Sequence, residues 1–194
     1  MLILASRSAS RRAMLDAAGV PYMAEPADLD ERALGAALEP DGPGAVALGL
    51  ARAKARAISA RNPGRLVLGS DSVVSCAGRR FDKPDSREAA TEHLAWFSGR
   101  TMELHSGVAL VRDGAVVFEL ADLARLKVRT LSAGFIKGYL DEEWPEVGYC
   151  VGVFRIEGRG VNLFEAIEGS QFTVLGMPLL PVLAALREHG IMPR

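Results

Sequence analysis

Hydroxyl and arginine side chains gather in the segment Ser6-Arg7-Ser8-Ala9-Ser10-Arg11-Arg12, which follows the apolar run Leu2–Ala5. The change from apolar to polar residues predicts a buried strand, a loop and a helix start, with Ser8 or Ser10 as N-cap. Such a loop presents free backbone N–H groups to an anion, and Arg11 and Arg12 add guanidinium donors that match phosphate oxygens. The pattern indicates an anion site, although an ordinary capped helix with solvated arginines has the same sequence.

Two acidic motifs are candidates for a metal ligand or a proton acceptor. Asp71 lies in Gly69-Ser70-Asp71-Ser72, directly after the apolar segment Leu66–Leu68, and Asp30-Glu31 follows a short extended segment. Active sites of open α/β sheets form at the ends of parallel strands, where a carboxylate can bind a divalent cation or accept a proton from water. A turn cap at Asp71 and a solvated pair at Asp30-Glu31 are the alternatives.

Two lysines complete the set of charged candidates. Lys54 lies between Arg52 and Arg56 in an alanine-rich segment, where an exposed helix face is the default, and Lys83 precedes Pro84. The sequence has no His-Glu-x-x-His, no Gly-x-Ser-x-Gly and no Walker-type phosphate loop. Catalysis is therefore expected to rest on carboxylates, cations and a bound metal. Residue chemistry alone indicates an anion-handling α/β domain, such as an enzyme of phosphate esters.

The elements that must position these residues alternate between strands and helices. Strands are predicted at Leu2–Ala5, Leu66–Leu68, Thr101–Leu110, Ala115–Leu120, Leu126–Arg129 and Val151–Ile156, and a short extended segment at Pro21–Pro26. Helices are predicted at Arg11–Ala18, Ala45–Ala60, Ser86–Trp96, Ser132–Glu143 and Pro178–His189. Asp113-Gly114 indicates a hairpin turn between two of the strands. This order predicts an α/β fold with a mixed sheet.

Composition narrows the class of protein further. The 194 residues include 23 basic and 24 acidic side chains, for a formal charge of −1, and 49% are hydrophobic. A single globular domain over 1–194 is expected, without the basic excess of a nucleic-acid-binding surface. The two cysteines form no motif and no apolar run approaches the ~20 residues of a membrane span, so we expect a cytoplasmic protein without membrane contact.

The ordered set of motifs resembles the Maf family of nucleoside triphosphate pyrophosphatases. The segment Leu4–Arg12 is similar to the family's opening Leu-Ala-Ser-x-Ser-Pro-x-Arg-Arg signature. The motifs that follow in the family's order are Asp30-Glu31, Ala51–Ala55, Gly69-Ser70-Asp71, Lys83-Pro84, Ser98-Gly99, Glu157–Gly160, Ile167-Glu168-Gly169 and Val174–Leu179. Ala9 stands where the family usually has proline and Asp82 where it usually has glycine, and we expect activity to survive both departures.

The resemblance implies an elongated, inosine-triphosphatase-like fold with a substrate cleft between two lobes. It also implies hydrolysis of a nucleoside triphosphate to its monophosphate and diphosphate with a divalent metal cation, Mg or Mn. By this resemblance the catalytic residues are Asp71, which activates water for attack at the α-phosphorus, and Glu31, which supports the metal or the water; both are implied metal ligands. The substrate-binding residues implied are Ser6, Arg11, Arg12, Lys54 and Lys83.

Three positions bear on the base that is recognised. Members that resemble the dTTP/UTP branch carry Arg, Thr and Gln there, and members that resemble the 7-methyl-GTP branch carry Trp, Gln and Glu; this chain has Ser10, Ser72 and Glu157. Only Glu157 matches, and its carboxylate can accept hydrogen bonds from guanine and favours the positive charge that N7 methylation adds. We expect 7-methyl-GTP or a broader set of modified nucleotides, with dTTP/UTP as the alternative.

A non-enzymatic, nucleotide-binding regulator of septum formation is the rival from another class, because a binding protein can use the same cations. The apolar face of Leu179–Leu186 fits either the interior of the monomer or a homodimer interface, and the sequence does not choose between them.

Overall fold

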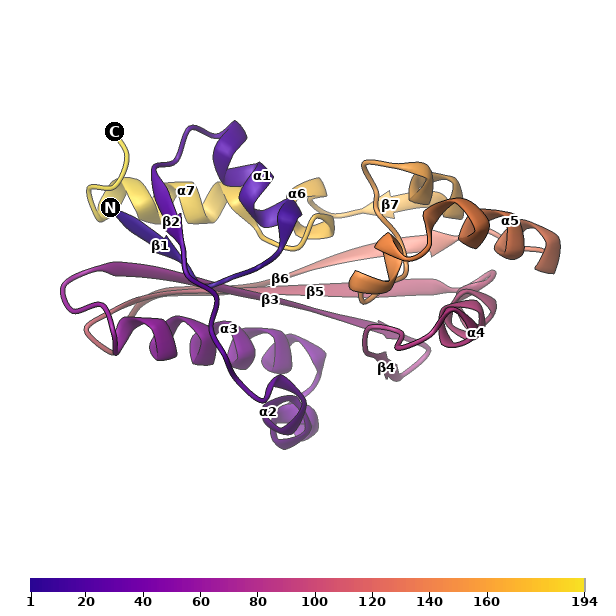
Figure 1. Cartoon of the computed structure of the whole chain (residues 1–194), viewed down its shortest axis with the longest axis horizontal. Helices are drawn as coiled ribbons and strands as arrows, with labels where there is room; N and C mark the ends of the chain where they lie inside the picture. Colours follow the sequence, from indigo (N-terminus) through magenta and orange to yellow (C-terminus); the bar gives the residue numbers. More distant parts are fainter. Residues whose placement is uncertain (194) are drawn as a thin grey trace. The chain divides into compact units, whose positions relative to one another are not determined.

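The computed structural model describes residues 1–193. Within them, seven strands form a mixed sheet in the order β2-β1-β3-β5-β6-β7, with β4 paired to β3 (Figure 1). Parallel pairs join β1 to β2 and to β3, whereas β3–β4 and β6–β7 are antiparallel. The strands are β1 (Leu2–Leu4), β2 (Tyr22–Ala24), β3 (Leu66–Cys76), β4 (Arg79–Phe81), β5 (Thr101–Arg112), β6 (Ala115–Val128) and β7 (Phe164–Glu168). The predicted mixed α/β class is confirmed.

The helices begin where the sequence supplies caps. Ser8, Asp30, Ser86 and Ser132 each accept a hydrogen bond from the backbone N–H three residues later, which satisfies one of the free donors of a first turn. The α-helices are α1 (Ala9–Ala17), α2 (Glu31–Leu38), α3 (Pro43–Ser59), α4 (Arg87–Phe97), α5 (Ala133–Glu143), α6 (Gln171–Val174) and α7 (Leu179–Glu188). Short 3₁₀ helices occupy η1 (Glu39–Asp41), η2 (Glu146–Tyr149) and η3 (Arg159–Leu163).

The chain divides into two compact units, each built from separate stretches of sequence. The first contains Met1–Ser72, His105–Leu123 and the segment from Ser170 onward. The second contains Val73–Leu104 and Ala124–Gly169.

In the first unit, alternation along the strands separates two apolar layers, because successive side chains point to opposite faces of a sheet. Leu66 and Leu68 of β3 pack with α1 and α7, whereas Val67 packs with Ala55 and Ile58 of α3. Figure 1 shows α3 on one face of these strands and α1 and α7 on the other. The buried face of α7 therefore lies in the core of the monomer, and the apolar face noted at Leu179–Leu186 packs there.

Two glycines bring α3 onto the sheet at close range. A Cβ added to Gly69 would lie 2.0 Å from the carbonyl oxygen of Ala51, and one added to Gly107 would lie 2.5 Å from that of Ala47. Only glycine allows the backbones to approach this closely. This contact fixes the height of α3 above β3 and hence the position of every α3 side chain near Gly69.

The second unit has an aromatic core. Phe81 lies edge-on to Phe97 with ring centroids 4.7 Å apart, and its centroid is 5.0 Å from that of His93. The hydroxyl of Tyr139 donates to the carbonyl of Val153 at 3.0 Å, and Arg155 pairs with the buried Glu143 at 2.8 Å. These contacts hold the turns that precede Glu157.

Two hairpins have the two-residue turns that suit strand twist. In one turn Asp113 and Gly114 have φ of 51° and 79°, and in the other Ala77 and Gly78 have φ of 51° and 76°. Two positive φ values in succession define the type I′ turn, which confirms the turn predicted at Asp113-Gly114.

Three predicted strands need correction. The strand predicted at Leu66–Leu68 continues to Cys76, and the one at Leu126–Arg129 is the end of the long β6. Val151–Ile156 forms turns instead of a strand, since Val153 has φ of 57° and its N–H donates to the carbonyl of Cys150. The apolar pattern there reflects burial in turns, because Val153 and Phe154 are 0% and 6% exposed. In residues 1–193, no helix is long and apolar enough to span a bilayer.

Candidate active site

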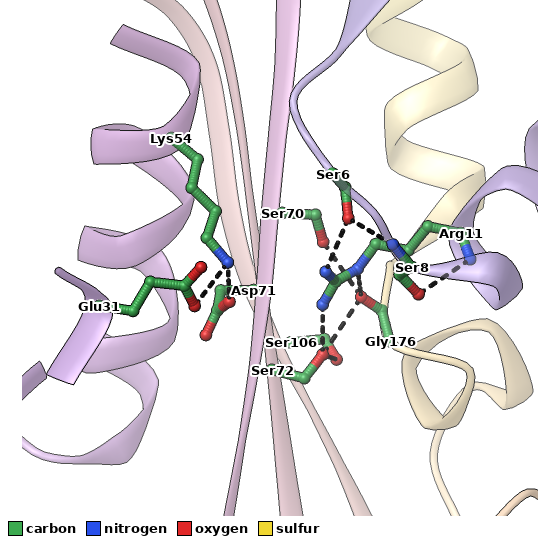
Figure 2. A network of polar contacts seen from close by, with 10 residues as sticks. All are labelled: Ser6, Ser8, Arg11, Glu31, Lys54, Ser70, Asp71, Ser72, Ser106 and Gly176. Atoms are coloured by element: carbon green, nitrogen blue, oxygen red, sulfur yellow. Dashed lines mark hydrogen bonds and ion pairs between the residues drawn. The ribbon is translucent and has the colours of Figure 1, made fainter. Parts of the chain in front are cut away.

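A lysine bridges two carboxylates on one face of β3. The ammonium nitrogen of Lys54 lies 2.6 Å from Oδ1 of Asp71 and 2.9 Å from Oε2 of Glu31 (Figure 2). Lys54 and Asp71 are buried, at 8% and 9% exposure, whereas the Glu31 side chain is 47% exposed. The pair Lys54–Asp71 is thus held inside the unit, with Glu31 at its solvent side.

The local sequence explains how these three side chains meet. Gly69 and Asp71 are two residues apart and face the same way, so the close approach of α3 at Gly69 places Lys54 over Asp71. Glu31 stands in the first turn of α2, where Asp30 caps the helix by accepting from the N–H of Ala33 at 2.9 Å. Asp30 is therefore the capping residue of the acidic pair, and Glu31 the residue that reaches Lys54.

On the opposite face of β3, the Arg11 side chain is held by neutral oxygens. Its Nε donates to the carbonyl of Gly176 at 2.9 Å, and its terminal nitrogens donate to Oγ of Ser6 at 3.3 Å and of Ser72 at 3.0 Å (Figure 2). Burial lowers the pKa of Arg11, and the charges of Asp71 and Glu31 partly oppose this shift. Arg11 is thus a buried cation close enough to two carboxylates to interact with them, but it contacts neither in residues 1–193.

The first loop has the predicted geometry of a helix entry. Ser8 caps α1 through the N–H of Arg11, donates its own N–H to Ser6 Oγ at 3.2 Å and lies 3.2 Å from Ser10 Oγ. The alternative, a capped helix with solvated arginines, holds for Arg12, which is exposed, but fails for Arg11. The carbonyl of Arg12 accepts a hydrogen bond from the Tyr22 hydroxyl at 3.5 Å.

The structure thus brings together seven of the predicted site residues in the first unit: Ser6, Ser10, Arg11, Glu31, Lys54, Asp71 and Ser72. Lys83 and Glu157 are exposed and belong to the second unit. There, burial and then the charge of Glu157 raise the pKa of the Cys150 thiol, and Lys83 opposes this shift.

One structural premise of the prediction is wrong. Asp71 does not end a strand; it lies within the 11-residue β3. Pairing with β1 nevertheless stops at Leu68, and pairing with β4 starts at Val74, so neither strand pairs with the segment that carries Asp71. The functional side chains stand where a parallel neighbour ends, although their own strand continues.

Asp71 and Glu31 supply part of the donor set that a divalent metal needs. In residues 1–193 no group of three or more His, Cys, Asp or Glu side chains is placed to hold a metal. Asp71 and Glu31 supply two carboxylates, and each gives one oxygen to Lys54. Because Mg²⁺ is commonly held by one or two carboxylates together with substrate phosphates, these residues fit a cation that arrives with the substrate.

Four residues of the network are absent from the sequence-based prediction: Ser70, Ser106, Thr173 and Gly176. The carbonyl of Gly176 accepts from Arg11, from Ser70 Oγ at 3.0 Å and from Ser72 Oγ at 3.2 Å. Gly176 has φ of 100°, which favours glycine. The signal available in the sequence was the period-two pair Ser70 and Ser72 between the apolar segments Leu66–Leu68 and Val73-Val74, which places both hydroxyls on one face of a strand.

Comparison with known proteins decides the family. A family model described as Maf-like protein matches residues 1–189. The chain belongs to the Maf family. This Maf chain is 47% identical over 191 residues to a nucleoside triphosphate pyrophosphatase of Nitrobacter hamburgensis, covering 98% of this chain and 95% of that protein. It is 48% identical over 191 residues to a 7-methyl-GTP pyrophosphatase of Mesorhizobium japonicum, covering 97% of this chain and 96% of that protein.

Solved structures give a more distant likeness to this Maf chain. A dITP/XTP pyrophosphatase from Mycobacterium abscessus aligns with a TM-score of 0.44 at 16% identity, covering 99% of this chain and 97% of that one. A HAM1 protein from Coxiella burnetii aligns with a TM-score of 0.43 at 18% identity, covering 66% and 72%.

Proposed function

We propose that this Maf chain is a nucleoside triphosphate pyrophosphatase, which hydrolyses its substrate to a nucleoside monophosphate and diphosphate. The observation that carries the proposal is Arg11, a buried guanidinium that within residues 1–193 is bonded only to neutral oxygens, on the face of β3 opposite the Lys54–Asp71 pair. The charge of Lys54 is balanced by Asp71 and Glu31, whereas no carboxylate contacts Arg11 within residues 1–193, so the Arg11 guanidinium suits a polyanionic substrate. The similarity to relatives named as pyrophosphatases extends over nearly their whole length and supports the same reaction.

Asp71 is the proposed proton acceptor. Lys54 donates to Oδ1, and Oδ2 takes no hydrogen bond from residues 1–193, so this oxygen is available to a water. As the water oxygen attacks the α-phosphorus, its proton passes to Asp71 and the bond from that phosphorus to the bridging oxygen breaks. The electron pair of the broken bond leaves with the diphosphate.

The cations offset the charge that the departing diphosphate gains. Arg11 has five N–H groups, of which three are used within residues 1–193, leaving one on each terminal nitrogen for phosphate oxygens. Lys54 balances part of the charge of Asp71 and Glu31 on the carboxylate side of the site. A Mg²⁺ or Mn²⁺ ion bound by Asp71, Glu31 and the phosphates supplies further charge neutralisation when present.

We propose 7-methyl-GTP as the favoured nucleotide, with Glu157 as the residue that accepts hydrogen bonds from guanine. Glu157 is exposed and therefore open to a ligand. The relatives in Mesorhizobium japonicum and Rhizobium etli, 48% and 47% identical, are named 7-methyl-GTP pyrophosphatases. The two unpaired cysteines, Cys76 and Cys150, suit the reducing cytoplasm in which we propose that the enzyme acts.

The decisive experiment measures diphosphate release from 7-methyl-GTP, GTP, dTTP, UTP and CTP with Mg²⁺ or Mn²⁺. We expect the fastest release from 7-methyl-GTP and a loss of roughly 100- to 10,000-fold in kcat for Asp71→Asn. The exposed Asp41→Asn is the matched control and should retain activity. A preference for dTTP or UTP would discard the role of Glu157. If the folded chain released diphosphate from none of them, the nucleotide-binding regulator would replace the enzyme.

A further inference from the structure

A chain of hydroxyl groups leads from Arg11, through the half-buried Ser72, into the interior of the first unit. Arg11 donates to Ser72, whose Oγ lies 3.1 Å from Oγ of Ser106 (Figure 2). Ser106 donates to the carbonyl of Thr173 at 2.9 Å. Ser106 is 0% exposed and projects from β5 on the face of the sheet that carries Ser72. No part of the predicted site includes Ser106.

Counting the hydroxyl hydrogens shows which group donates at each step of this series of hydrogen bonds. Each serine hydroxyl has one hydrogen, and a carbonyl has two lone pairs. Ser106 uses its hydrogen on Thr173, so in the contact with Ser72 it must accept. Ser72 Oγ lies near two acceptors, Ser106 Oγ at 3.1 Å and the Gly176 carbonyl at 3.2 Å, but it has one hydrogen. Because Arg11 and Ser70 already use both lone pairs of the Gly176 carbonyl, we assign the hydrogen of Ser72 to Ser106.

The series of hydroxyl groups ends at Thr173, which is itself held in place. Thr173 is 0% exposed, and its own hydroxyl donates to a carboxylate oxygen of Asp122. Gly176 follows three residues later, so α6 and the turn after it present the two acceptor carbonyls, which hold Arg11 through the serines and directly. The arrangement fixes the guanidinium plane at two points, Nε and one terminal nitrogen.

We propose that Ser72 and Ser106 are positioning residues that orient Arg11 for the phosphates, and that Ser72 does not read the base. This proposal rests on the proposed function, since it assigns the phosphate-binding arm of that site. The hydroxyl of Ser72 has its hydrogen committed to Ser106 and one lone pair committed to Arg11, so it cannot donate to a base without breaking its bond to Ser106. The proposal thereby revises the specificity role expected for Ser72.

The test compares Ser72→Ala and Ser106→Ala with Ser59→Ala. Ser59 is also a buried, hydrogen-bonded serine, at 2% exposure, but accepts from the N–H of Gly114 outside this network. We expect both network variants to lower kcat/KM roughly tenfold, the scale of one hydrogen bond to a charged group. The loss should be equal for 7-methyl-GTP, GTP, dTTP and UTP, and the double variant should lose little more than either single one. Ser59→Ala should keep the wild-type kcat/KM.

A conservative variant keeps the proposal falsifiable if an alanine variant folds poorly. Ser72→Thr retains the hydroxyl and should retain activity and the wild-type order of nucleotides. A changed order of nucleotides in Ser72→Thr or Ser72→Ala would overturn the proposal, as would unchanged kcat/KM in a folded Ser106→Ala.

Binding of inorganic diphosphate, measured by calorimetry, separates this proposal from the proposed function. If the wild type hydrolyses none of the nucleotides, the enzyme proposal fails. The network proposal then stands if Ser106→Ala weakens diphosphate binding roughly tenfold relative to Ser59→Ala, and falls if binding is equal.

Discussion

Arg11 is a buried, charged side chain whose partners leave its charge available to an anion. A guanidinium in direct contact with a carboxylate is already neutralised, whereas Arg11 is held by two serines and a carbonyl. These partners satisfy its geometry without cancelling its charge. The free energy of its burial is therefore recovered in part when an anion binds, which is how binding sites trade stability for function.

Replacing Arg11 by methionine should separate activity from stability. We expect kcat/KM to fall about a hundredfold, because the charge-assisted contacts to phosphate are lost. The free energy of unfolding should fall by less than about 1 kcal/mol, since removing a desolvated charge offsets the lost hydrogen bonds. Steady-state kinetics and urea unfolding of the same preparation measure both. A loss of several kcal/mol would mean that Arg11 is chiefly a structural residue.

At the scale of elements, the helices and most strands follow from local pattern, and the site does not. The helix starts at Ser8 and Ser86 can be predicted from the sequence because an N-cap bonds to a backbone N–H only three residues away. The full length of β3 is hidden because Gly69-Ser70-Asp71-Ser72 has the composition of a turn, and pairing with neighbouring strands overrides that preference. Recognising a strand there would have placed Asp71 and Ser72 on opposite faces.

Partners in the site are decided by tertiary contacts between distant residues. The bond from Arg11 to Gly176 spans 165 positions, and no local pattern specifies which carbonyl meets which guanidinium. Lys54 was expected by default on an exposed helix face, yet the close approach at Gly69 buries it.

Gly69→Ala tests the contact that seats α3. The added Cβ would meet Ala51 and Ala55 backbone atoms at 2.0 and 2.8 Å, so α3 must move away from β3. We expect a loss of about 3 kcal/mol in the free energy of unfolding, and lower kcat as Lys54 shifts from Asp71. Gly138→Ala, exposed in α5 with no atom within 4 Å of its added Cβ, is the control and should stabilise by about 0.5–1 kcal/mol. Equal effects of the two substitutions would refute the role of this contact.

The β3–β4 hairpin can be improved by one residue. Ala77 is exposed at φ of 51°, where an L-residue other than Asn or Asp is strained, and Gly78 follows. Ala77→Asn should raise the free energy of unfolding by about 0.5–1 kcal/mol without changing kcat/KM. Thermal unfolding monitors the gain. An unchanged or lower midpoint would argue against strain at Ala77.

At the scale of the whole molecule, stability against pH depends on His93. Its Nδ1 is buried without a partner in residues 1–193, between the rings of Phe81 and Phe97. Burial, and then the charge of Arg79, lower its pKa below the ordinary 6.5, while Glu92, Asp82 and Asp85 oppose the shift. The folded chain therefore holds His93 neutral at a pH where the unfolded chain protonates it.

The sign follows from proton linkage. As pH falls through 6.5, the unfolded state binds a proton that the folded state does not, so the free energy of unfolding decreases. We expect wild-type stability, measured by urea unfolding between pH 7.5 and 5.5, to fall more steeply than that of His93→Gln. Parallel pH profiles for the two proteins would show that His93 does not contribute.

The residues that hold Arg11 lie far apart in the order in which a ribosome makes them. Ser6, Ser8 and Arg11 emerge first, Ser72 and Ser106 follow, and Thr173 and Gly176 come near the end. Until Gly176 has been synthesised, Arg11 lacks the carbonyl that accepts from its Nε, and the core of the first unit lacks α7. The proposed phosphate-binding arm is therefore incomplete in the growing chain, and we expect affinity for nucleotides to appear only once α6 and α7 have been translated.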